Sequence, residues 1–106
     1  MNIENLVADR GKQYGAFYDN AAVIQELKEV LLNNSQDWLK LQPDVKQALE
    51  MICTKIGRII TGNPDNIDSW EDIAGYSVLV ADRIRKDKEW VKTSAPPVKA
   101  PVQGVR

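Results

Sequence analysis

Two carboxylates have a spacing that suits metal binding. Asp68 and Asp72 stand four residues apart, which places both side chains on one face of a helix. Carboxylates on adjacent helical turns are a common way to hold Mg²⁺ through oxygen ligands. A structural role is the alternative, because Asp68 can cap a helix and acidic residues near a helix N-terminus are favoured by its dipole.

Two cations, Lys55 and Arg58, interrupt an otherwise apolar run. They are three residues apart and project to the same side of a helix, so they can converge on one anion. A guanidinium can fork onto a phosphate, while an ammonium acts as a point charge. Because buried cations need a partner, the sequence predicts either a phosphate site here or an internal ion pair to the next helix.

A third group of residues is concentrated in the segment Arg10-Gly11-Lys12-Gln13-Tyr14-Gly15. Glycines let the backbone approach a phosphate, the two cations can bind it, and the tyrosine can stack on a base. We expect either an anion- or nucleotide-binding loop or a helix-ending turn with solvated cations.

The elements that must position these residues are helices. Apolar residues recur at helical spacing along most of the chain, and no segment alternates as a strand would. We expect helices over residues 2–10, 19–33, 43–61 and 68–90, with a loop over residues 10–17. The prediction is an all-α fold, an antiparallel bundle of about four helices.

Capping residues predict where two of these helices begin. Asp19 or Asn20 can cap the second helix, since both side chains accept hydrogen bonds from free backbone N–H groups. Asp68 and Glu71 have the spacing of a capping box at the start of the fourth helix.

Composition excludes several classes of chemistry. The 106 residues include no histidine, which rules out Ser-His-Asp catalysis, His-ligated zinc and proton shuttling by imidazole. The lone Cys53 cannot form an intrachain disulfide, which fits a reducing compartment. No apolar run approaches the ~18 residues that span a bilayer, and the N-terminus lacks a secretory signal. We expect a soluble, cytoplasmic protein with no membrane partner.

Charge divides the chain into two parts. Residues 92–106 carry three basic residues and no acid, which leaves 11 basic and 15 acidic residues in 1–91, a net charge of -4. An acidic body argues against general nucleic-acid binding. The proline-containing segment has no aromatic residue to anchor it. We expect a helical domain over residues 1–91 and a flexible basic tail over residues 92–106, through which a protein partner could dock.

The third predicted helix is apolar over much of its circumference. Such a helix needs partners on several sides, and about 90 ordered residues bury only about 60–65% of their unfolded surface. We expect a homodimer or higher oligomer with the third and fourth helices at the interface. A monomer with a few exposed apolar residues is the alternative. The apolar residues are Met51, Ile52, Cys53, Ile56, Ile59 and Ile60.

Several segments together resemble a known family. They are the segment from Arg10 to Gly15, Asn20, Ala48-Leu49-Glu50-Met51-Ile52 with Lys55-Ile56-Gly57-Arg58, and Asp68-Ser69-Trp70-Glu71-Asp72-Ile73-Ala74-Gly75-Tyr76. Over residues 9–85 the chain is similar to a phage- and prophage-borne branch of the MazG-like all-α nucleoside triphosphate pyrophosphatases. Enzymes of that superfamily are usually dimers or tetramers. They release pyrophosphate with Mg²⁺ held by a Glu-x-x-Glu pair and a Glu-x-x-Asp pair on consecutive helices.

The resemblance implies a nucleotide-handling function. Glu50, Asp68 and Asp72 would hold Mg²⁺, with Glu50 and Asp72 acting in pyrophosphohydrolysis. The phosphates would be held by Arg10, Lys12, Lys55 and Arg58, and the base by Tyr14 or Tyr76.

The chain departs from the family's pattern on both helices. The residues three and four positions after Glu50 are Cys53 and Thr54, so the first carboxylate pair is incomplete. On the fourth predicted helix, Asp68-x-x-Glu71 and Asp68-x-x-x-Asp72 only approximate the second carboxylate pair. The alternatives to an enzyme are therefore a protein that sequesters a nucleotide-like signal without turnover, and a protein-interaction module that counters host defence or modulates the host.

Overall fold

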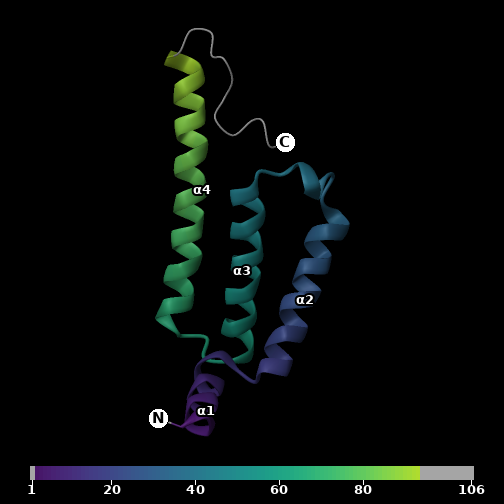
Figure 1. Ribbon diagram of the computed structural model, residues 1–106, viewed down its shortest axis with the longest axis vertical. Helices are drawn as coiled ribbons and strands as arrows, with labels where there is room; N and C mark the ends of the chain where they lie inside the picture. The colour runs from purple at the N-terminus through teal and green to yellow at the C-terminus, as the bar shows by residue number, and fades with distance from the viewer. Residues whose placement is uncertain (1, 94–106) are drawn as a thin grey trace.

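The computed structural model describes residues 2–93, and within them the predicted all-α fold is confirmed. The elements are α1 (Ile3–Tyr14), α2 (Phe17–Asn34), the short 3-10 helix η1 (Trp38–Lys40), α3 (Pro43–Thr61) and α4 (Ile67–Thr93). Figure 1 shows α2, α3 and α4 side by side and antiparallel, with α3 in the middle and α1 at the end where α4 begins.

Two features of the helices bear on the predicted tail and on the predicted relation to membranes. Helix α4 continues through residues 92 and 93, and the rest of the predicted tail lies outside the described residues. None of the helices in residues 2–93 is long and apolar enough to cross a bilayer.

The predicted loop at the start of the chain is wrong. Helix α1 continues to Tyr14, so Gly11 is helical and only Gly15 and Ala16 connect α1 to α2. Contacts beyond the helix outweigh the ~1 kcal/mol cost of a helical glycine. The N–H of Asn63 donates to Gln13 O at 2.9 Å and holds the last turn of α1 against the end of α3.

Two of the predicted caps are also wrong, while the bounds of α3 are confirmed. Helix α2 has Ala16 as its N-cap with no side-chain hydrogen bond, so Asp19 and Asn20 lie inside it. Helix α4 begins one residue before Asp68, and Asn66 caps it by accepting a hydrogen bond from Ser69 N at 3.1 Å. Side-chain acceptors occur at several neighbouring positions here, so the sequence alone does not single out the cap.

Helix α3 contacts the other three helices, yet the layer encloses very little interior. The hydrophobic residues that are buried in the described part of the chain are Ala48, Cys53 and Ile59. The closest approach of α2 requires a glycine, because a Cβ on Gly57 would lie 2.6 Å from Ile24 Cγ1. A single layer of helices therefore leaves much of its apolar surface uncovered.

One glycine fixes the position of α1 against the end of α3. Gly15 ends α1 with a φ of 84°, a left-handed conformation that disfavours any side chain. A Cβ on Gly15 would also collide with the backbone of Thr61. The Thr61 hydroxyl donates to Tyr14 O at 3.1 Å, so the residue before Gly15 is tied to the last turn of α3.

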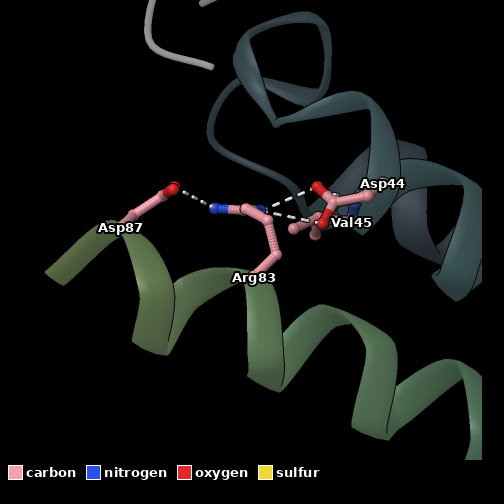
Figure 2. A network of polar contacts seen from close by, with 4 residues as sticks. All are labelled: Asp44, Val45, Arg83 and Asp87. Atoms are coloured by element: carbon pink, nitrogen blue, oxygen red, sulfur yellow. Dashed lines mark hydrogen bonds and ion pairs between the residues drawn. The ribbon is translucent and has the colours of Figure 1, made fainter. Parts of the chain in front are cut away.

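A charged network joins α3 to α4 near the other end of the layer (Figure 2). Arg83 donates from Nη2 to Asp44 Oδ1 at 2.7 Å and from Nε to Asp44 Oδ2 at 2.9 Å, and its Nη1 lies 3.2 Å from Asp87 Oδ2. The hydrogen bond from Arg83 lowers the pKa of Asp44 below its ordinary value of 3.8. The same hydrogen bond raises the pKa of Arg83. Two-pronged pairing of this kind fixes orientation as well as distance.

The Asp44–Arg83 pair gives a pH-dependent prediction. Asp44→Asn should lower the free energy of unfolding at pH 7 by about 1 kcal/mol, a value reduced for the partial exposure of the pair. Because the folded-state pKa of Asp44 is lowered, its contribution is complete above about pH 5 and is lost as the pH falls through the lowered value. Urea unfolding of both proteins from about pH 7 to about pH 2 measures this difference.

A matched control is Asp37→Asn, whose exposed carboxylate lies 3.6 Å from Lys40. Exposed pairs contribute little, so this variant should unfold like the parent. A stability difference for Asp44→Asn that stays constant down to about pH 2 would contradict an ionic origin.

Candidate functional site

Two guanidinium groups from different helices share one tyrosine ring. The Cζ atom of Arg58 on α3 lies 4.7 Å from the centre of the Tyr14 ring, and that of Arg10 on α1 lies 5.5 Å from it. Both distances suit cation–π attraction. The structure thus brings together three of the residues that the sequence predicted for ligand binding.

A hollow of about 520 Å³ opens beside these residues. It is lined by α1, the α1–α2 connection, the start of α2 and Arg58. Its volume lies within the roughly 300–1,000 Å³ typical of small-molecule sites. No acidic side chain is among the described residues that line it, so the two arginines set its charge.

The charge of the hollow is not neutralised internally. Within residues 2–93, no carboxylate lies within ion-pair distance of Arg10 or Arg58. The two guanidinium groups repel each other, and the face of Tyr14 offsets part of that repulsion. An anion between them would be attracted by both, so the hollow is electrostatically suited to a phosphate.

Lys55 has a different partner. Its Nζ lies 2.9 Å from Asp72 Oδ2 on α4, and its side chain is only 10% exposed. The two cations of α3 therefore do not converge on one anion. Lys55 makes the internal ion pair that the sequence left open as an alternative, and Arg58 reaches the hollow.

The three carboxylates predicted for Mg²⁺ are not gathered in one place. Glu50 lines a small groove between α2 and α3, with Lys28 and Trp38 among its neighbours. Asp72 is engaged by Lys55 on the α4 side, and Asp68 is exposed in the first turn of α4. No group of three or more carboxylate, cysteine or histidine side chains in the described chain is arranged to hold a metal. These donors do not fit a three-carboxylate Mg²⁺ site.

Two further predicted ligand residues lie outside the hollow, and two unpredicted residues line it. Lys12 is exposed on α1 and Tyr76 is half-buried on α4, and neither lines the hollow. Phe17 and Asn20 do. Phe17 lies at the edge of the predicted loop, where its type and spacing carry no binding signal, and the sequence predicts a capping role for Asn20. The continuation of α1 to Tyr14, which places the start of α2 beside Arg10, carries no clear sequence signal.

Comparison with known proteins gives one family. Residues 2–84, most of the chain, match a family described as a domain of unknown function, DUF6378. No curated protein and no solved structure matches the chain.

The Lys55–Asp72 pair predicts a stability effect at Asp72. Asp72→Asn leaves the Lys55 ammonium buried without its carboxylate, so the free energy of unfolding should fall by about 1–2 kcal/mol, allowing for the half-exposed Asp72 side chain. Chemical unfolding at pH 7 measures it. Asp68→Asn, four residues earlier and exposed, is the control and should change stability by less than about 0.5 kcal/mol. Equal effects of the two substitutions would contradict a structural role for the pair.

Proposed function

The chain belongs to the DUF6378 family, and we propose that it binds a nucleotide or a similar phosphorylated small molecule in the hollow beside Tyr14. The observation that carries the proposal is the pair of arginines, Arg10 and Arg58, which lie over one ring without a carboxylate partner in residues 2–93. Arg58 is half-buried and Arg10 is exposed. A half-buried cation without a counter-charge is costly, and a bound anion would supply the missing charge to Arg58 and also attract Arg10.

In this proposal both arginines bind the phosphate through their guanidinium groups. A guanidinium donates two parallel hydrogen bonds to phosphate oxygens. Arg58 comes from α3 and Arg10 from α1, so a phosphate between them would join the two helices. Contact with the Tyr14 ring positions each guanidinium group before the ligand arrives, which reduces the ordering that binding requires.

The resemblance to MazG-like pyrophosphatases supports a nucleotide as the ligand, and the placement of the carboxylates supports binding without hydrolysis. Glu50 and Asp72 face different neighbours, with Asp72 neutralised by Lys55. A protein of this kind would sequester a nucleotide-like signal in the cytoplasm. Mg²⁺-dependent pyrophosphohydrolysis would need a group of carboxylates that residues 2–93 of one chain do not bring together.

The proposal includes self-association through the open face of the helix layer. A groove of about 280 Å³ runs between α3 and α4, and its lining is apolar except for Ser77. Among the groove residues of α3 and α4 are Val45, Leu49, Ile52, Val80 and Ile84. A second copy related by a two-fold axis presents the same apolar strip. Packing the two strips together would supply the interior that a single layer lacks.

Replacement of Arg58 tests the ligand proposal. Arg58→Met keeps the aliphatic stem and removes the charge, so the Kd for a nucleoside triphosphate should rise at least tenfold, while the melting temperature of the free protein stays within a few degrees. Isothermal titration calorimetry measures the Kd. The control is Arg85→Met, because Arg85 is exposed on α4 and pairs with Asp82 away from the hollow. This variant should bind like the parent. Loss of stability with unchanged affinity would show that Arg58 is structural.

Replacement of Ser77 tests the assembly. Ser77 is exposed in the single chain yet lines the apolar groove, so Ser77→Arg costs the monomer little and places a charge in the proposed interface. Light scattering should give twice the chain mass of 11.9 kDa for the parent and the chain mass for the variant. Val78→Arg, on the adjacent position outside the groove, should remain dimeric. A parent protein that has the chain mass at micromolar concentration would contradict the dimer.

A further inference from the structure

Phe17 is an aromatic residue that the fold leaves uncovered. Its residue surface is 87% exposed, the highest fraction among the exposed large hydrophobic residues in the described part of the chain. It is the first residue of α2 and lines the same hollow as Arg10 and Arg58. An exposed aromatic face beside a cationic hollow is the arrangement that proteins use to stack bases next to bound phosphates.

Asn20 lies one turn further along α2 and is 7% exposed. Its Nδ2 donates to Tyr14 O at 3.0 Å. Because a backbone carbonyl only accepts, the side-chain atom that faces it must be the nitrogen, which turns Oδ1 away. Among residues 2–93, no donor reaches that oxygen, and Asn20 lines the hollow. Asn20 is a nearly buried residue, but its Oδ1 is not among the fully buried side-chain atoms that lack a partner in the described chain. This acceptor is therefore open to a ligand N–H group.

These residues give the hollow three kinds of contact in addition to its shape: two guanidinium groups, an exposed aromatic ring and a free amide oxygen. We infer that Phe17 and Asn20 select a nucleoside phosphate over inorganic phosphates, an inference that rests on the proposed function. Phe17 stacks on the base, and Asn20 Oδ1 accepts a hydrogen bond from a base N–H, while Arg10 and Arg58 hold the phosphates. Stacking on Phe17 is tolerant of base identity, because every base has a π-face.

The test compares two ligands and two neighbouring aromatic residues. The Kd values of a nucleoside triphosphate and of inorganic triphosphate are measured by calorimetry for the parent and for Phe17→Ala. The variant should bind the nucleotide about tenfold or more weakly and inorganic triphosphate within twofold of the parent. Because Phe17 is exposed, this substitution leaves folding unchanged, which the melting temperature checks.

Tyr18 is the matched control, since it is also an exposed aromatic residue, at 82%, but does not line the hollow. Tyr18→Ala should bind both ligands like the parent, and Phe17→Trp should restore nucleotide binding by offering a larger stacking face.

The outcomes separate this inference from the proposed function. A parent protein that binds neither ligand would overturn both. If the parent binds the nucleotide and Phe17→Ala leaves that affinity unchanged, or weakens both ligands equally, the selection of the base by Phe17 is wrong and the phosphate site stands. Conversion of the protein from dimer to monomer by Phe17→Ala with nucleotide affinity retained would assign the exposed ring to self-association instead.

Discussion

A layer of three antiparallel helices has almost no interior, and this constraint governs how the chain uses its charged residues. Helix α3 lies between α2 and α4, but few of its apolar side chains are fully buried. Directional polar contacts therefore help to hold α4 against α3. Arg83 pairs with Asp44 at one end of the α3–α4 contact, and Lys55 pairs with Asp72 nearer the other end. The same openness leaves an apolar groove between α3 and α4, which is the surface of the proposed dimer.

Four cations that lie between helices differ in their partners. Lys55 and Arg83 face carboxylates on the adjoining helix, and their charges are satisfied within the fold. Arg10 and Arg58 instead face the ring of Tyr14, which attracts a cation but does not neutralise it. A guanidinium that is positioned without being neutralised is suited to bind an anion, and this difference distinguishes the proposed ligand site from the structural ion pairs.

The sequence predicted the helices better than the site because the two depend on different information. Periodic apolar residues, Pro43 and Gly62 marked both ends of α3, since these signals are local. The two cations of α3 share a face by spacing alone, and only the position of α4 shows that Lys55 has a carboxylate within reach. The joining of Arg10 to Arg58 depends on contacts across about fifty residues, made by Gln13, Gly15 and Thr61. No local pattern shows that Gly11 lies within a helix rather than a loop.

The central claim is that the hollow binds a phosphorylated ligand through arginines, without a metal held by the chain. The most direct measurement is the melting temperature of the parent protein across a series of nucleotide concentrations, with a chelator and then with Mg²⁺ in its place. The account predicts that the melting temperature rises with nucleotide in the chelator, corresponding to about 2.7 kcal/mol of added stability at a hundredfold excess over Kd. No rise with any nucleotide, or a rise only when Mg²⁺ is present, would contradict it.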